Sequence, residues 1–575
     1  MKIRITSLLS MFAVVLLSIC AGFFVLRTRA QSSQGESHTI LYLHGRIYTN
    51  DPEHPWADAM AIRENKIRCV GKIDFVLLEC GGNDPAAETI QLRGKFLMPG
   101  FNDAHVHLGS AGAGMLSVQL NGVATIEELQ KRVADAVSHH KEGEWITGGG
   151  WDHTLWPDKK FPNKDQLDAV APKNPVFLTH VSGHVAVANT LALQHGEIKD
   201  DTPNPPGGVI ERDADGHPTG MLEEDSAMSL VSARIPDLKA DQRRRGIQLA
   251  LADAAKNGVT SAQDFSDWAD YLTYVQLKEE GKLTLRITEW LPFISSMDDL
   301  LNMRAQGGTS DPWLRTGALK GFIDGALGSR TAAMLAPYSD DPSTSGILTN
   351  DPDKLRSMAI ERDKAGFQIA FHAIGDRANH VALDVFEAVL KTNGPRDRRD
   401  RVEHAQVLSL DDLPRFSQLK VIASMQPSHE TSDMRWAGQR IGPDRAKGAY
   451  AWNSLLKSGA RLAFGTDYPV EPITPMRGLY ACVTREFPEG GPVGGWQGQE
   501  KISMDDCIHA YTSGAAYAQF EEGKKGELKP GEYADFIILS DDITKIPPKD
   551  LAKVTVLRTV VGGRIVYPTD GGSLP

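Results

Sequence analysis

Two histidines separated by one residue, His105 and His107, are the side chains with the clearest chemical potential in this 575-residue chain. They follow an apolar run at residues 96–98 and a Pro-Gly break. In a β-strand, side chains two positions apart point to the same face, so both imidazoles would face one point. Imidazole is a frequent ligand of zinc, iron and nickel, although any two histidines can fall two apart by chance. The pair therefore predicts a metal site only if other ligands join it.

Four further reactive side chains lie near the ends of apolar segments, and these are Lys320, His372, His404 and Asp467. Because successive side chains of a strand point to opposite faces, the reactive side chain of each segment lies on the face opposite the larger apolar ones. In residues 368–374, for example, Ile369 and Phe371 share one face and His372 lies on the other. The apolar side chains can then pack outward on helices while the reactive ones point inward.

The elements that must position these side chains are apolar strands that alternate with helical stretches, which is typical of parallel βα units. We expect eight strands, at residues 96–105, 258–265, 286–293, 318–324, 368–374, 401–406, 421–427 and 461–467. Eight strands close an α/β fold of the (β/α)8 TIM-type barrel class, whose active sites lie at the C-terminal strand ends. The six reactive side chains then lie on strands one, four, five, six and eight.

The remaining segments surround this barrel, which we expect to span residues 96–524. Both chain ends consist of short alternating segments, so residues 38–95 and 525–567 are predicted to form one small β-sandwich. A gap of about 150 residues separates strands one and two, far more than a helix and two loops need. We therefore expect residues 109–237 to form an inserted subdomain over the barrel mouth.

The N-terminus has the features of an export segment. Basic residues precede a largely apolar run at residues 7–26, and Thr-Arg-Ala at residues 28–30 has the pattern of a cleavage site. Residues 1–30 are thus either a cleaved signal peptide or a membrane anchor, because the run is also long enough to span a bilayer. We expect a periplasmic, secreted or membrane-anchored protein with its catalytic part outside the cytoplasm. A disulfide between Cys69 and Cys80 is allowed there.

Composition and charge exclude several classes of protein. The chain is 41% hydrophobic and 24% charged, which is typical of a globular protein. Its net charge of −12 leaves no basic surplus to neutralise phosphates, so we expect no nucleic-acid partner. The five cysteines include no Cys-x-x-Cys pair, which excludes cysteine-type zinc sites. The sequence leaves open whether the chain forms a homo-oligomer.

Three longer motifs connect the histidine pair to a known family. They are PGFNDAHVH at residues 99–107, DGALGSRTA at residues 324–332 and LKPGEYADF at residues 528–536. These motifs occur in order along the chain, with the segments that contain His372, His404 and Asp467 between the second and the third. On this basis the chain resembles the amidohydrolase superfamily from about residue 38 to 567. The branch that it most resembles is amidohydrolase family 3, which contains N-substituted formamide deformylase.

The resemblance implies a role for each predicted site residue. The implied metal ligands are His105, His107, Lys320, His372, His404 and Asp467, of which Asp467, His372 and His404 are also catalytic. They would hold one or two divalent ions, with zinc as the expected metal. Lys320 would bind as a carbamate that bridges two metals, because a free ammonium has no lone pair to offer a metal. The alternative is an inward lysine that is paired with Asp324. The implied substrate-binding residues are Trp151, Asp152, His184 and Arg330. A tryptophan such as Trp151 is also a common core residue.

Together with the resemblance, the site predicts a metal-dependent hydrolase. It would cleave a non-peptide carbon–nitrogen bond of a small molecule, such as an N-substituted formamide. Metal-activated hydroxide would attack the carbonyl, and Asp467 would take the water proton and return it to the departing nitrogen. Hydroxide attack does not fix the leaving atom, so an ester, lactone or phosphoester hydrolase is the alternative. A non-catalytic exported binding protein is a further class, disfavoured because it needs no proton shuttle.

Overall fold

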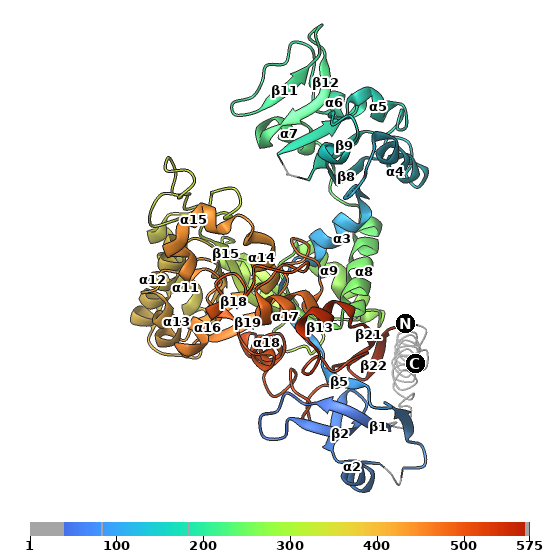
Figure 1. Ribbon diagram of the computed structural model, residues 1–575, viewed down its shortest axis with the longest axis vertical. Coiled ribbons are helices and arrows are strands. Elements are labelled where there is room, and N and C mark those ends of the chain that lie inside the picture. Colours follow the sequence, from blue (N-terminus) through green and yellow to red (C-terminus); the bar gives the residue numbers. More distant parts are fainter. Residues whose placement is uncertain (1–38, 82–83, 182–183, 570–573, 575) are drawn as a thin grey trace, which may run out of the picture.

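The computed structural model describes residues 39–81, 84–181, 184–569 and 574. The predicted signal peptide or membrane anchor at residues 1–30 lies outside the described residues. Among those that are described, no helix combines the length and the apolar character that crossing a membrane requires. Figure 1 shows a central barrel, a sheet below it and a subdomain that stands clear above it.

The central region is a barrel of eight parallel strands, as predicted. In spatial order the strands are β6 (Phe101–Val106), β13 (Val259–Asp264), β14 (Arg286–Pro292), β15 (Leu314–Phe322), β16 (Ile369–Ala373), β17 (Arg401–His404), β18 (Ile422–Met425) and β19 (Arg461–Phe464). The chain after β19 returns to β6 and closes the ring. There the His107 N–H donates to the Tyr468 carbonyl at 2.7 Å, and the Asp467 N–H donates to the His105 carbonyl at 2.8 Å.

The first predicted strand, residues 96–105, is in fact two strands in two sheets. β5 (Phe96–Pro99) pairs with strands of the chain ends, whereas β6 begins at Phe101 and belongs to the barrel. Gly100 separates them where the backbone passes the Thr260 side chain so closely that an added Cβ would lie 2.2 Å from the methyl carbon. Both strands are fully buried, and the Pro-Gly break at residues 99–100 is the point where the chain passes from one sheet to the other.

Helices surround the barrel and bury the outward-facing apolar side chains of its strands. Leu319, Ile369 and Phe371 belong to one large core that also contains the helical residues Leu355 and Val385, in agreement with the predicted alternation. The helices of this region are α8 (Ala240–Lys256), α9 (Trp268–Glu279), α10 (Met297–Gly307), α11 (Pro352–Lys364), α12 (Asp376–Asn393), α13 (Leu413–Leu419), α14 (Pro427–Asp433), α15 (Ala437–Arg445), α16 (Trp452–Lys457), α17 (Pro475–Thr484), α18 (Met504–Ala510) and α19 (Ser513–Ala518).

A second eight-stranded sheet contains strands from both ends of the chain, in the order β22-β21-β20-β5-β1-β2-β3, with β4 paired to β1. Besides β5, its strands are β1 (Thr39–Tyr48), β2 (Trp56–Arg63), β3 (Lys66–Gly71), β4 (Glu88–Gln91), β20 (Phe536–Leu539), β21 (Val556–Val561) and β22 (Arg564–Tyr567). The two chain ends meet where β5 and β20 pair in antiparallel fashion. A buried ion pair, Arg286 Nε to Asp535 Oδ2 at 2.6 Å, ties this sheet to the barrel.

Two disulfides are present in the described part of the chain. Cys69 in β3 is bonded to Cys80 in α2 (Ile73–Cys80), which is the pair that the sequence allows. Cys482 in α17 is bonded to Cys507 in α18. This second bond was not predicted, because it depends on how two helices pack and not on a local pattern.

The inserted subdomain is built on a six-stranded sheet in the order β11-β12-β10-β9-β8-β7. Its elements are β7 (Val118–Gln119), α4 (Ile126–Ser138), β8 (Ile146–Trp151), η1 (His153–Leu155), α5 (Lys164–Asp168), β9 (Val176–His180), β10 (Val185–Ala188), α6 (Thr190–His195), β11 (Val209–Arg212), β12 (Pro218–Glu223) and α7 (Glu224–Ser232). The chain enters it through α3 (Leu108–Leu116) and leaves it through α8. These helices cross so closely that a Cβ on Gly112 would lie 2.5 Å from the carbonyl carbon of Gly246. We expected this subdomain over the barrel mouth, but Figure 1 shows it standing away from the barrel, beyond α3 and α8.

Candidate metal centre

The histidine pair lies at the C-terminal end of β6, and both side chains face Asp467, which follows β19. His107 Nε2 lies 3.2 Å from Asp467 Oδ1, and His105 Nε2 lies 3.7 Å from the same oxygen. Potential ligand atoms of the three residues all lie within 4.8 Å of one another. His105 is fully buried, and Asp467 is nearly so. Two imidazole nitrogens and a carboxylate oxygen are a donor set that divalent transition metals bind.

Acceptors behind the two rings determine which nitrogen faces this point. His105 Nδ1 lies 2.7 Å from Glu403 Oε2, and His107 Nδ1 lies 2.8 Å from the Phe265 carbonyl oxygen. Because each acceptor requires a proton on Nδ1, the lone pair of each ring is on Nε2 and points toward Asp467. Burial lowers the pKa of His105 well below its usual value, so this ring is neutral. The donors present therefore fit a bound metal ion.

A second histidine group faces the other oxygen of Asp467. His429 Nε2 lies 3.5 Å from Asp467 Oδ2, and His404 Nδ1 lies 4.0 Å from it. Potential ligand atoms of these three residues also lie within 4.8 Å of one another. His404 Nδ1 is 2.9 Å from the side-chain oxygen of Gln426. Asp467 thus stands between two groups of imidazoles, with one carboxylate oxygen toward each.

His429 is a residue of this centre that the sequence did not single out. It lies in the first turn of α14, two positions beyond the predicted strand at residues 421–427. That position is at the barrel end where active sites lie. The strand prediction therefore contained a usable signal, because a histidine just beyond the C-terminal end of a barrel strand can reach the centre.

His372, on β16, lies on the His404 side of the centre. The centroids of the two rings are 4.5 Å apart. His372 Nε2 is 3.1 Å from the Gly325 carbonyl oxygen and 3.6 Å from Asp324 Oδ1. Burial lowers the pKa of His372 to about 4, so its ring is neutral at physiological pH.

Lys320, on β15, lies inside the barrel with 2% of its surface exposed. Its Nζ is 2.9 Å from His105 Nε2, the atom that also faces Asp467. Burial lowers the pKa of Lys320 to about 8, which makes its neutral amine accessible near neutral pH. The carboxylate of Asp324, the alternative partner of Lys320, is already hydrogen-bonded to other groups. Asp324 accepts hydrogen bonds from three backbone N–H groups, those of Ala333, Ile374 and Gly375.

Two residues of the centre adopt a left-handed backbone conformation that residues other than glycine rarely take. The angle φ is 73° at His404 and 59° at Asp467. The hydrogen bond from the Asp467 N–H to the His105 carbonyl helps to hold this conformation. Such geometry costs on the order of 1–3 kcal/mol and is concentrated at sites where a side chain must be aimed.

Three of the four predicted substrate-binding residues lie in the inserted subdomain, apart from the histidine groups. Trp151 is fully buried in the core of the inserted subdomain, where its indole N–H donates to a backbone carbonyl at 3.0 Å. Asp152 caps η1, and the side chain of His184 is 61% exposed. These three residues belong to the subdomain that stands away from the barrel (Figure 1). Arg330 follows β15, and its Nη2 lies 2.8 Å from Asp340 Oδ2.

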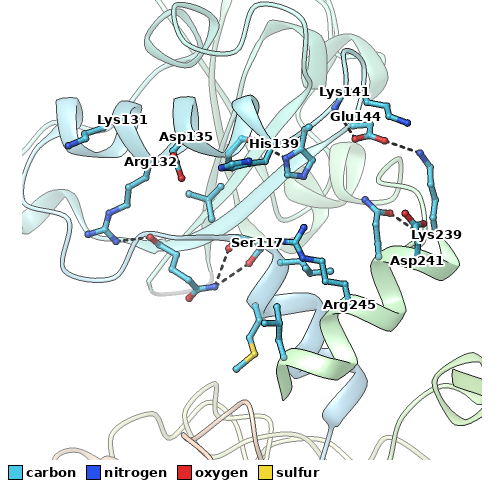
Figure 2. A pocket seen from close by; sticks show the side chains of 18 of the residues that line it. Ser117, Lys131, Arg132, Asp135, His139, Lys141, Glu144, Lys239, Asp241 and Arg245 are labelled. Atoms are coloured by element: carbon cyan, nitrogen blue, oxygen red, sulfur yellow. Dashed lines mark hydrogen bonds and ion pairs between the residues drawn. The ribbon is translucent and has the colours of Figure 1, made fainter. Parts of the chain in front are cut away.

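A cavity of about 840 Å³ lies between the subdomain and α8 (Figure 2). Ser117, Arg132 and His139 line it from the subdomain, and Lys239 and Arg245 line it from the start of α8. Acidic side chains share the lining, so it carries both signs of charge. None of the predicted site residues lines this cavity, which therefore marks the base of the subdomain and not the metal centre.

Comparisons with known proteins agree with this arrangement. A family model described as "Amidohydrolase family" matches residues 88–567. The chain is 39% identical over 542 residues to Protein LONG AFTER FAR-RED 3 of Arabidopsis thaliana, which covers 92% of this chain and 91% of the relative. It is 28% identical over 548 residues to N-substituted formamide deformylase of Arthrobacter pascens, covering 92% and 99% of the two chains. A crystal structure of an uncharacterized metal-dependent hydrolase from Pyrococcus furiosus matches with a TM-score of 0.73 and 32% identity, covering 88% of this chain and 100% of the other.

Proposed function

The chain belongs to the amidohydrolase family and is a hydrolase acting on carbon–nitrogen bonds, and we propose from this premise that it cleaves an N-substituted formamide or a related non-peptide amide with the help of zinc. The observation that carries the proposal is the position of Asp467. One of its oxygens faces His105 and His107, and the other faces His404 and His429. A carboxylate shared by two imidazole groups can hold a metal and move a proton in the same place.

One or two zinc ions would occupy this centre. His105 and His107 would hold the more deeply buried ion, and His404 with His372 would hold a second ion or orient the substrate. The centre offers nitrogen and oxygen donors without thiolates, which suits a zinc-class ion. When bound, such an ion lowers the pKa of its water toward about 7 and polarises a substrate carbonyl.

Asp467 is the proposed proton carrier. Burial alone would raise the pKa of Asp467, but the close approach of His107 and the neighbouring imidazoles lowers it overall, so the carboxylate stays ionised. It can accept the proton of the attacking water and return it to the departing nitrogen, first as general base and then as general acid. His372 and His404 would hold the substrate carbonyl in line with that attack.

Lys320 is the proposed bridging ligand. Its amine, when neutral, can add to carbon dioxide and release one proton, which leaves a carbamate with two oxygens. The distance of 2.9 Å from Nζ to His105 Nε2 supports this, because it puts the new group beside the first histidine pair. A carbamate would supply an anionic bridge that the ammonium cannot.

The remaining proposals concern the rest of the chain. Residues 1–30 would export the protein or anchor it, and the two disulfides suit a catalytic part outside the cytoplasm. Residues 38–95 and 525–567 would fold as one unit, since strands from both share a sheet. The substrate would be a small molecule, and the subdomain would have to approach the barrel for Asp152 or His184 to touch it.

A matched substrate panel tests the proposed reaction. Zinc-loaded protein is assayed with N-benzylformamide, N-butylformamide and the formate esters of the same two groups, with amine or alcohol release as the readout. The proposal predicts zinc-dependent release of amine from the formamides. Hydrolysis of the esters with no detectable amine release from any amide of a wider panel would contradict it and favour the ester-hydrolase alternative.

A further inference from the structure

A second cluster of metal-ligating side chains lies in the inserted subdomain. β8 and β9 are adjacent parallel strands, and Trp151 at the end of β8 is in register with His180 at the end of β9. Asp152 and His153 follow β8 directly. Potential ligand atoms of Asp152, His153 and His180 all lie within 4.8 Å of one another. The ends of two neighbouring strands thus bring two imidazoles and one carboxylate together, outside the barrel.

The positions of these three side chains are fixed by their surroundings. His180 Nε2 lies 3.9 Å from Asp152 Oδ1. The Trp151 ring meets the His180 ring edge-on with centroids 4.6 Å apart, and the Phe161 ring lies 4.1 Å from that of His153. Asp152 is held by Thr154, whose N–H and hydroxyl donate to Oδ1 at 2.9 and 2.6 Å. The cluster is therefore packed in one arrangement by aromatic rings and local hydrogen bonds.

An unpartnered imidazole nitrogen in the cluster also suits a cation. His153 Nδ1 is buried and makes no hydrogen bond within the described part of the chain. A buried imidazole nitrogen without a hydrogen-bond partner, beside a carboxylate and a second imidazole, is an arrangement in which these side chains can bind a metal ion.

We propose that Asp152, His153 and His180 form a second divalent-metal site, which takes a zinc-class transition-metal ion and is separate from the barrel centre. Two nitrogens and one oxygen suit Zn²⁺, Co²⁺ or Ni²⁺ better than Mg²⁺ or Ca²⁺, which prefer oxygen ligands. A bound ion would tie η1 to the end of β9. This gives Asp152 a role other than the substrate contact that the family resemblance implies.

Metal counting on the full-length chain tests the site. The protein is stripped with chelator, dialysed against Zn²⁺, passed through a desalting column and analysed for bound zinc by mass spectrometry. The variant His153→Ala/His180→Ala should hold one equivalent less than the wild type. A matched control, His139→Ala/His140→Ala, removes two histidines from the same subdomain at the end of α4 and should keep the wild-type count. Equal counts for the wild type and His153→Ala/His180→Ala would overturn the proposal.

Two further variants keep the test decisive. His105→Ala/His107→Ala should keep the one equivalent of zinc that is bound in the subdomain. Loss of that equivalent together with the barrel ions would contradict a separate site. His180→Gln is a milder change, used if circular dichroism shows that the double alanine variant does not fold. With Co²⁺ as the probe, the wild type should show a visible absorption contribution that His180→Gln lacks. Identical Co²⁺ spectra for these two folded proteins would overturn the assignment of His180 as a ligand.

Discussion

The barrel and the inserted subdomain each bring two histidines and an aspartate together, but in different surroundings. In the barrel, the side chains of His105 and Asp467 are 0% and 8% exposed, whereas His180 and Asp152 in the subdomain are 12% and 25% exposed. The barrel imidazoles are backed by Glu403 and by a backbone carbonyl, which fix their tautomers. The subdomain rings are held mainly by aromatic neighbours. Only the barrel adds a second histidine group on the other side of its carboxylate.

We infer from this difference that the barrel cluster is the reaction centre and that the subdomain cluster would hold a structural ion. A reaction centre needs a proton acceptor beside the metal ligands and beside further polar groups, and Asp467 lies between two groups of imidazoles that could hold an ion. A structural ion needs ligands that join separate segments, which the ends of β8 and β9 provide. The two clusters should therefore respond differently when a ligand, a proton acceptor or a supporting residue is removed.

The largest expected effect comes from removing the barrel pair. His105→Ala/His107→Ala should abolish amide hydrolysis and lower the zinc content of the barrel, because both lone pairs that face Asp467 are lost. Activity assays and metal analysis of the same preparation measure this. A double variant that keeps wild-type activity would show that the pair is not part of the reaction centre.

Changing Asp467 should have the next largest effect. Asp467→Asn keeps the shape of the side chain and removes the basic oxygen, so we expect kcat to fall by at least about 10²-fold, the low end for general acid–base catalysis. Zinc content and the circular dichroism spectrum should remain close to those of the wild type. Near-normal kcat, in protein shown to be free of wild-type enzyme, would exclude the proton-carrier role.

Glu403 tests whether support behind a ligand matters in the barrel. Glu403→Gln should weaken zinc binding by about 10–100-fold, because the carboxylate orients His105 and increases its basicity. The readout is the zinc dissociation constant in a competition titration with a chelating dye. Glu361→Gln changes a largely exposed glutamate, 60% of whose side chain is accessible, and serves as the control. The same affinity in both variants would show that Glu403 does not support the ligand.

The smallest expected effect lies in the subdomain. With zinc present, His180→Gln should lower the melting temperature of the subdomain by about 4 °C, the shift expected for a loss of about 1 kcal/mol in a domain of this size. In the presence of chelator the two proteins should melt at the same temperature. A difference that persists without metal would mean that His180 stabilises the fold by packing alone.

The sequence predicted the barrel and the inward positions of its reactive side chains because both follow from strand periodicity. His105, His372 and Asp467 alternate with apolar residues, and barrel geometry then gathers them at one end. His429 was missed because it lies on α14, after the strand pattern has ended. The change of sheet at Gly100 was also missed, since both strands are fully buried and burial does not show which sheet a strand joins.

Other features depend on packing that no local pattern records. Cys482 and Cys507 lie 25 residues apart on two helices, so their bond appears only once those helices are placed. Trp151 was compatible with a pocket or a core from its type alone, and the subdomain sheet puts it in the core. The orientation of the subdomain depends on how α3 and α8 cross, which the long gap between strands one and two does not reveal.

The most direct test of the central claim is the zinc dependence of formamide hydrolysis by the intact chain. Metal-free protein is titrated with Zn²⁺ while amine release from N-benzylformamide and bound zinc are measured together. The account predicts no activity without metal and a rise to full activity as the barrel fills. Full amide hydrolysis by protein shown to contain no metal would contradict it.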